Sequence, residues 1–306
     1  MLVLKAQVGA KMLKIGSLCT GYGGLDMAVE AYFGAETIWV SEFDKYASKV
    51  VEARINKPNF GNLKVIDWHE MEPIDILTAG YPCQPFSQAG LRKGAQDERH
   101  LWPYIKTAIS ILRPQYVILE NVRGHFGLGF REVLSDLTSI GYDARWTLIR
   151  ASEVGAPHRR ERLFILAYPN STRWTRTEPS DIQTPQPWNS SSFDNSPIAD
   201  TNSNACTQSR GTDTKLRAES FRLRGRQDER QTWAKPRFSF EMDKENVPPA
   251  LDQDKLNVKF VEYMMGLPDG WVSDVGLSRA QTLKILGNGV VPQQAYKAIE
   301  LLHNVK

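Results

Sequence analysis

Short apolar segments alternate with amphipathic segments over residues 12–168, and this alternation limits the chain to few folds. The segments that we expect to form short buried strands are Ile15–Leu18, Thr37–Val40, Ile74–Ala79, Tyr116–Leu119 and Phe164–Ala167. The segments between them that have helical spacing are Gly24–Ala35, Asp44–Ile55, Leu101–Leu112 and Phe130–Ile140. Because strands that alternate with helices usually join one parallel sheet, the pattern predicts an α/β fold.

The composition changes sharply after this α/β region. In residues 169–256 Ser, Thr, Asn, Gln, Pro and Arg dominate, whereas residues 257–306 return to helical patterning. A polar segment of this kind is compatible with a disordered linker, but its three tryptophans favour some ordered structure. We therefore expect one main domain of residues 12–168 plus 257–306, a smaller domain at 169–256, and an N-terminal extension at 1–11.

Composition and charge exclude several classes of protein. No apolar run approaches the ~18 residues that a membrane span needs, and the N-terminus, whether it starts at Met1 or Met12, lacks the features of a signal peptide. Three cysteines cannot form a disulfide framework, so we expect a reducing, intracellular setting. The 38 Lys+Arg and 35 Asp+Glu give a formal charge of +3, which alone decides nothing about a nucleic-acid partner.

A glycine-rich turn, Thr20–Gly24, lies between the first strand and the first helix. Such a turn lets a ligand approach the backbone and the helix N-terminus, although it is also common as a purely structural turn. The Walker A Lys-Ser/Thr pair is absent, so nucleotide hydrolysis is not expected. Glu42 follows the next strand at the spacing of an acid that binds ribose hydroxyls, and a solvated acid at a helix start is the alternative.

Three further strand ends carry reactive or charged side chains. Cys83 lies in a Pro-Cys-Gln-Pro loop after the strand Ile74–Ala79, a context that favours a nucleophile over a small core residue. Glu120 ends another strand, either as a capping group or as an acid–base residue. Arg160 and Arg162 precede the strand at Phe164, and period 2 would place both on one face, where they suit a phosphate or a base edge.

Taken in order, these motifs resemble the DNA (cytosine-5) methyltransferase family of bacterial or phage type. The motifs that carry the resemblance are Thr20–Gly24, Pro82-Cys83-Gln84, Glu120-Asn121-Val122, His158-x-Arg160-x-Arg162, Met265–Trp271 and Gly287–Pro292. The resemblance implies a Rossmann-like S-adenosylmethionine-dependent methyltransferase sheet with a smaller target-recognition domain, here residues 169–256.

The resemblance also implies a mechanism and its catalytic residues. Cys83 would add as a thiolate to carbon 6 of a flipped-out cytosine, so that carbon 5 attacks the sulfonium methyl. Glu120 would hold or donate a proton at ring nitrogen 3, and Arg162 would contact the base carbonyl. Arg162 and Arg160 would favour the thiolate. No metal is expected, because the cysteines and the scattered histidines do not form a zinc site.

Ten positions match the cofactor-binding positions of the family. They are Gly21, Tyr22, Gly23, Gly24, Glu42, Phe43, Asn62, Leu101, Asn288 and Val290. Asn62 stands where the family usually has an Asp, with Asp67 as a fallback. Cys19 replaces a phenylalanine, which removes an aromatic contact, and His158 replaces a glutamine.

Contact with double-stranded DNA is expected from two basic regions. The loop after Cys83 contributes Ser87, Arg92 and Lys93, and an ordinary surface loop is the alternative. Residues 206–237 contain nine basic and four acidic residues, so the net charge of this stretch, +5, exceeds the net charge of the whole chain, +3. Within it, three alternating arginines would share one side of a strand and face phosphates or guanine edges: Arg222, Arg224 and Arg226.

Two other functions remain open from the sequence. An RNA (tRNA) cytosine-5 methyltransferase would share the chemistry, although the long polar segment favours a DNA-recognition domain. A non-catalytic DNA-binding relative would share the fold, although the intact Cys83, Glu120 and Arg162 argue against it. We expect a cytoplasmic monomer in a bacterium or a phage-infected cell, which could accompany a restriction endonuclease.

Overall fold

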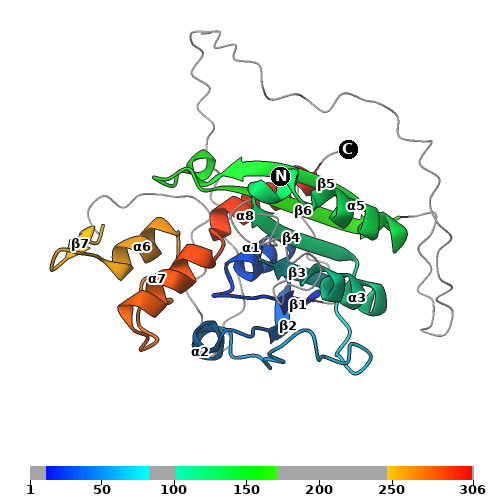
Figure 1. Cartoon of the computed structure of the whole chain (residues 1–306), viewed down its shortest axis with the longest axis horizontal. Helices are drawn as coiled ribbons and strands as arrows, with labels where there is room; N and C mark the ends of the chain where they lie inside the picture. The colour runs from blue at the N-terminus through cyan, green and yellow to red at the C-terminus, as the bar shows by residue number, and fades with distance from the viewer. Residues whose placement is uncertain (1–11, 83–100, 171–246, 305–306) are drawn as a thin grey trace, which may run out of the picture. The chain divides into compact units, whose positions relative to one another are not determined.

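A six-stranded sheet forms the centre of the protein (Figure 1). The computed structural model describes residues 12–82, 101–170 and 247–304, and all of these belong to one compact unit. The sheet order is β2-β1-β3-β4-β6-β5. Its strands are β1 (Lys14–Leu18), β2 (Glu36–Ser41), β3 (Ile76–Gly80), β4 (Tyr116–Val122), β5 (Tyr142–Arg150) and β6 (Glu161–Pro169).

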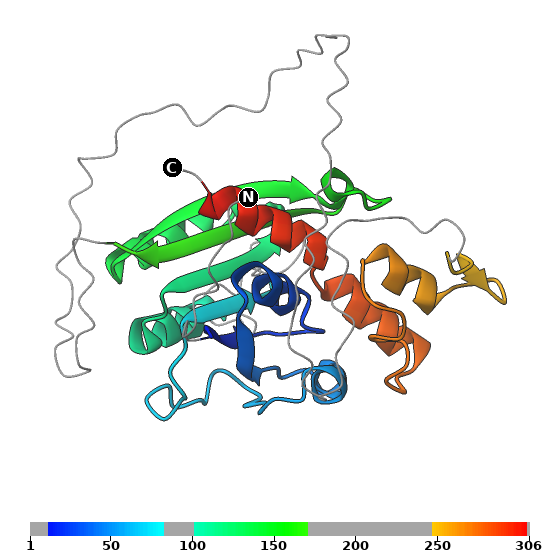
Figure 2. The same cartoon turned by 180° about the vertical axis from the view of Figure 1, so that it is seen from behind.

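Helices cover both faces of this sheet, as the two opposite views show (Figures 1 and 2). One face carries α1 (Gly24–Phe33) and α8 (Pro292–His303), and the other carries α3 (Trp102–Leu112) and α5 (Phe130–Ser139). The short helix α4 (Gly124–Gly127) precedes α5, and the 3-10 helix η2 (Ala151–Val154) follows β5. Within the described ranges, no helix is long and apolar enough to cross a membrane.

The alternation of side chains along the strands decides which residues meet which helices. Ile76 and Ile118 pack with α1 and α8, whereas their neighbours Leu77 and Leu119 pack with α3 and α5. Following the same alternation, three polar residues belong to the face that α1 covers: Ser17, Thr78 and Glu120. This face therefore brings polar groups from three adjacent strands together near the carboxyl ends of the strands.

The α/β fold and the expected strands and helices of residues 12–168 are confirmed, with differences at their ends. The sheet is not wholly parallel, because β6 runs antiparallel to both β4 and β5. Strand β5 was not expected, since it is an edge strand with many half-exposed residues and no apolar run. The strand expected at Phe164–Ala167 is longer, but it begins at Glu161 and does not include Arg160.

A second group of helices packs beside the sheet. Helix α2 (Lys45–Arg54) follows β2, α6 (Val258–Met264) follows the small β7–β8 hairpin (Leu251–Asp252 and Lys255–Leu256), and α7 (Arg279–Asn288) leads to α8. These helices share an apolar cluster that includes Val50, Met265 and Leu286. The sequence predicted α2, and within residues 257–306 its helical spacing at Phe260–Met265 and Gln293–Leu302 predicted α6 and α8, whereas α7 was not predicted.

The segment Gly287–Val291, which runs from the last residues of α7 to the start of α8, packs on the glycine turn that precedes α1. Tyr22 Oη donates a hydrogen bond of 2.6 Å to the carbonyl of Val290. A Cβ on Gly24 would overlap that carbonyl, and a Cβ on Gly289 would overlap the ring of Tyr22. These two glycines are therefore required by the close approach of two segments that lie at opposite ends of the sequence.

This contact predicts different effects for two neighbouring glycines. Gly289→Ala should lower the free energy of unfolding by ~1–3 kcal/mol, because the added methyl group must displace the Tyr22 ring. Gly287→Ala is the matched control, since open space surrounds Gly287 and alanine favours a helix by up to ~1 kcal/mol. Urea unfolding of both full-length variants tests the contact, and equal stabilities would contradict it.

Candidate active site

A cavity of about 510 Å³ opens at the carboxyl ends of β1, β3 and β4. Its walls come from the glycine turn, the end of β2, the ends of β3 and β4, and the segment that follows α7. The expected site residues that line it are Gly21, Gly24, Glu42, Glu120, Arg162, Asn288 and Val290. The structure thus brings together residues that are spread over almost the whole sequence, in a volume typical of a small-molecule site.

Glu42 is held directly after β2 by two backbone donors. Its Oε2 accepts from the N–H of Gly21 at 2.7 Å, and its Oε1 accepts from the N–H of Asp44 at 2.8 Å. Burial raises the pKa of this carboxyl, and the two backbone hydrogen bonds oppose the rise. Because each carboxylate oxygen has a further lone pair, Glu42 can still accept hydrogen bonds from ligand hydroxyls.

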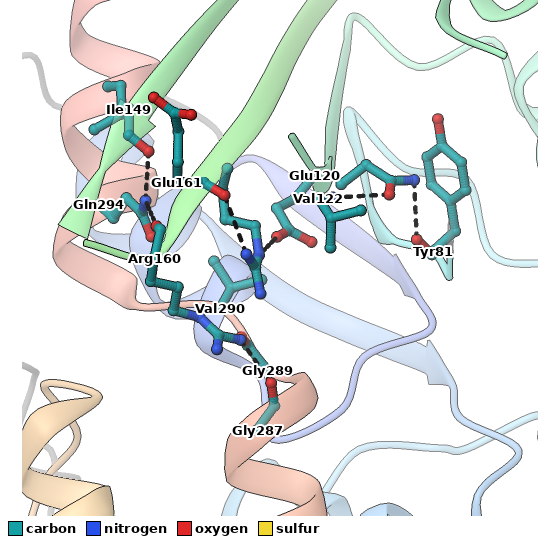
Figure 3. Close-up of polar contacts among 12 residues, drawn as sticks. Tyr81, Glu120, Val122, Ile149, Arg160, Glu161, Gly287, Gly289, Val290 and Gln294 are labelled. Carbon is teal, nitrogen blue, oxygen red and sulfur yellow. Dashed lines mark hydrogen bonds and ion pairs between the residues drawn. The ribbon is translucent and has the colours of Figure 1, made fainter. Parts of the chain in front are cut away.

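Glu120 and Arg162 form a buried ion pair at the wall of the cavity (Figure 3). Arg162 Nε lies 2.9 Å from Glu120 Oε1, and the side chains are 15% and 8% exposed. Burial raises the pKa of Glu120 to about 7, although Arg162 and Arg160 lower it. Near neutral pH this carboxyl can therefore exist with or without its proton, which suits a group that holds or donates one.

Arg160 supports the wall of the cavity from outside it. Its Nη2 donates to the carbonyls of Gly287 at 2.8 Å and Gly289 at 2.6 Å, as Figure 3 shows. Gln294 Nε2 in turn donates to the carbonyl of Arg160 at 2.7 Å. The expectation that Arg160 shares a strand face with Arg162 is wrong, because its φ of 26° places it before the start of β6.

A buried carboxylate that the sequence analysis did not single out also lines the cavity. Asp26, in the first turn of α1, accepts hydrogen bonds from Ser17 Oγ at 2.9 Å and from Thr78 Oγ1. Ser17 and Thr78 are partners in the register of β1 and β3, so both hydroxyls reach the same carboxylate. Burial raises the pKa of Asp26 to about 6, and the two hydroxyls partly oppose this.

Several expected cofactor positions are not among the residues that line the cavity. The side chain of Tyr22 is buried against Val290, and Gly23 is the left-handed residue before α1. Phe43 is 76% exposed between Glu42 and Asp44. Asn62 Oδ1 accepts from the N–H of Lys64. Asp67, the alternative to Asn62, accepts a hydrogen bond from the N–H of His69. Leu101, directly before α3, packs against the hydrophobic core.

Two positions that depart from the family pattern have clear local roles. Cys19 lines the cavity with a positive φ of 52°, and burial raises the pKa of its thiol. His158 Nε2 donates to the carbonyl of Met264 at 2.8 Å and so links the segment before β6 to α6.

The remaining expected residues lie outside the described part of the chain. They are Cys83, Ser87, Arg92, Lys93, Arg222, Arg224 and Arg226, and their roles stay predictions. Tyr81 and Pro82, which follow β3 and lead to Cys83, do line the cavity.

A family model described as C-5 cytosine-specific DNA methylase matches residues 13–304. The chain belongs to this family. The Type II methyltransferase M.NgoBI of Neisseria gonorrhoeae is 35% identical over 173 residues, which cover 55% of this chain and 54% of that protein. M.Bsp6I of Bacillus sp. (strain RFL6) is 35% identical over 167 residues, or 52% and 53% of the two chains. The chain therefore spans about half the length of the curated relatives it matches.

A solved structure supports the fold over a longer range. The S. pombe Dnmt2 methyltransferase superposes with a TM-score of 0.56 and 16% identity over 95% of this chain and 98% of that one. At this identity the likeness concerns the fold alone.

Members of the C-5 cytosine-specific DNA methylase family use S-adenosylmethionine as methyl donor. The cavity fits this molecule on three observations. Its volume is that of a small-molecule site, Glu42 has free lone pairs at the end of β2, and Gly21 and Gly24 of the glycine turn line the cavity. Glu42 would therefore accept hydrogen bonds from polar groups of the donor, and Asn288 lines the same cavity.

The buried charge of Asp26 predicts a pH-dependent stability change. Its pKa is raised from ~3.9 in the unfolded chain to about 6 in the folded one, so the folded state loses stability as the pH rises from about 4 to about 6. Asp26→Asn should therefore raise the free energy of unfolding at pH 8 by up to about 3 kcal/mol, since one pKa unit corresponds to ~1.4 kcal/mol. Both hydroxyl partners can rotate to suit the amide.

Denaturant unfolding between pH 5 and pH 8 measures this difference. The gain should grow from pH 5 to just above pH 6 and stay nearly constant up to pH 8. Glu30→Gln, which removes a charge from the same helix but keeps an acceptor for the N–H of Thr37, should change stability by less than ~0.5 kcal/mol. A pH-independent effect of Asp26→Asn would contradict the prediction.

Proposed function

We propose that the protein is a DNA (cytosine-5)-methyltransferase that transfers a methyl group from S-adenosylmethionine to carbon 5 of cytosine in a short duplex sequence. The observation that carries the proposal is the buried pair Glu120–Arg162 on the wall of the cavity, beside the end of β3 that leads to Cys83. Nucleophilic attack on a pyrimidine ring requires three groups. They are a cysteine, an acid that titrates near pH 7 and a fixed guanidinium.

The proposed reaction begins with the Cys83 thiolate. A bond forms between its sulfur and carbon 6 of the cytosine, while Glu120 provides a proton at ring nitrogen 3 and Arg162 contacts the ring carbonyl. These contacts limit the negative charge that the ring acquires. When bound, S-adenosylmethionine supplies an electrophilic methyl group on a sulfonium.

The second half of the reaction regenerates the cysteine. After carbon 5 has taken the methyl group, a base removes the carbon 5 proton, the double bond between carbons 5 and 6 re-forms as the bond between sulfur and carbon 6 breaks, and Cys83 leaves as a thiolate. Ring nitrogen 3 returns its proton to Glu120. Because duplex stacking hides these ring atoms, the target cytosine must first swing out of the helix. We propose that residues 169–256 select the sequence, with Ser87, Arg92, Lys93, Arg222, Arg224 and Arg226 contacting the DNA.

The biological setting follows from the proposed activity and from the relatives. Their names describe Type II methyltransferases, which gives a reason to propose a bacterial or phage-infected cytoplasm and a companion restriction endonuclease. We propose that the enzyme acts as a monomer. Bisulfite sequencing of DNA from cells that express the chain would test the activity and identify the target sequence together.

Cys83→Ser should abolish methyl transfer, because a hydroxyl is a far weaker nucleophile toward carbon 6 than a thiolate. DNA binding should be retained. Transfer of labelled methyl groups to plasmid DNA, compared with a mobility shift on the same DNA, checks both parts. Full activity of the serine variant would exclude the cysteine mechanism. If the wild-type protein methylated tRNA but not DNA, the substrate would be tRNA.

Glu120→Gln should reduce kcat by about 10²- to 10⁴-fold, because the amide cannot donate the proton that the ring nitrogen needs. Donor affinity should change little, since glutamine preserves the volume of the side chain. Single-turnover methylation and equilibrium binding of S-adenosylhomocysteine separate the two effects. An unchanged kcat would show that Glu120 has no part in the chemistry.

A further inference from the structure

Of the buried carboxylates that line the cavity, Asp26 is the one whose negative charge its neighbours stabilise least. Glu120 is paired with Arg162, and Glu42 accepts from two backbone N–H groups. Asp26 is 3% exposed, and its partners are the hydroxyls of Ser17 and Thr78 and its own backbone N–H: among the described residues, no cation forms an ion pair with it. Asparagine would fit the same partners, so packing alone does not explain a carboxylate here.

The described wall of the cavity carries an excess of negative charge. Four carboxylates line it, and they are Asp26, Glu42, Asp44 and Glu120. Two cations oppose them, Arg162 and Lys284, and Lys284 is largely exposed in an ion pair with Asp44. The residues that line the cavity therefore have a formal excess of two negative charges, and Arg160, behind the wall, offsets part of this excess at Glu120. The buried charges act through a poorly polarisable surrounding.

This excess matters because the proposed donor and its product differ by one charge. S-adenosylmethionine has a sulfonium in addition to its ammonium and carboxylate groups, so its net charge is +1. Once the methyl group has left, the sulfur is neutral and the net charge of S-adenosylhomocysteine is zero. A fixed negative charge near the ligand therefore favours the donor over the product.

We propose that Asp26 is a specificity-determining residue whose buried charge shifts the relative affinity of the cavity toward the cationic methyl donor and away from its neutral product. The inference rests on the proposed function, because it takes S-adenosylmethionine as the ligand of this cavity. The proposal gives a function to the buried charge of Asp26, which lowers the free energy of unfolding. It also gives a physical route to product release, since methyl transfer removes the charge that Asp26 attracts.

Equilibrium binding to the full-length protein without DNA tests the proposal. The three probes are S-adenosylmethionine, S-adenosylhomocysteine and sinefungin, an analogue in which a carbon that bears a protonated amine replaces the sulfonium. Calorimetric titrations at pH 8, above the pKa of Asp26, would compare the wild-type protein with Asp26→Asn. Glu30→Gln is the control, because it removes the same charge from α1 at a residue outside the described cavity wall.

Asp26→Asn should weaken binding of S-adenosylmethionine and sinefungin by about tenfold and change binding of S-adenosylhomocysteine by less than about twofold. Glu30→Gln should leave the ratio of the three dissociation constants unchanged. An equal loss for all three ligands would overturn the proposal, because it would indicate a structural role or a contact with the shared methionine groups. Unchanged binding of all three would overturn it as well.

The same titrations separate this inference from the proposed function. If the wild-type protein binds none of the three probes, the choice of cofactor is wrong and the inference is overturned with it. If the wild-type protein binds them and only the donor preference fails to depend on Asp26, the proposed methyltransferase function stands. The denaturation experiments on Asp26→Asn described above establish that the variant is folded.

Discussion

The close contact between the glycine turn and the segment Gly287–Val291 is the constraint on which the site depends. Tyr22 donates to the carbonyl of Val290, while Arg160 holds the carbonyls of Gly287 and Gly289 from the other side. The contact joins the two ends of the described chain across the carboxyl edge of the sheet. It therefore places Asn288 and Val290 beside Gly21 and Glu42, although more than 240 residues separate them in the sequence.

The parts of the fold that the sequence predicted are those whose burial is nearly complete. Strands β1, β3 and β4 carry buried apolar residues on both faces, since helices cover both sides of the sheet, and such runs are easy to recognise. Strand β5 was not predicted, because Trp146 is 44% exposed and the residues next to it are half-buried at the edge of the sheet. The antiparallel direction of β6 could not be deduced, because strand direction depends on the path of the chain and leaves no periodic signal.

In the site too, some residue positions could be predicted from sequence motifs, whereas others depend on how the chain packs. Glu42, Glu120 and Arg162 lie on the cavity wall because each one ends or follows a strand, a position that the sequence displays. Arg160 belongs to the same motif, yet its guanidinium supports the backbone of another segment. Asp26 has a sequence signal, an acid directly after a glycine turn, but its burial depends on Ser17 and Thr78, which interrupt two otherwise apolar strands.

Two carboxylates of this one cavity illustrate how surroundings assign chemical roles. Both are buried, and burial raises the pKa of Glu120 to about 7 and that of Asp26 to about 6. At Glu120, burial and the adjacent guanidinium act on the pKa in opposite directions, and the carboxyl can take up or release a proton near neutral pH. At Asp26, two hydroxyls donate to the carboxylate and no described cation pairs with it, so its charge stays uncompensated once it ionises. The first environment suits catalysis and the second suits selection of a charged ligand, which is why one wall can carry both.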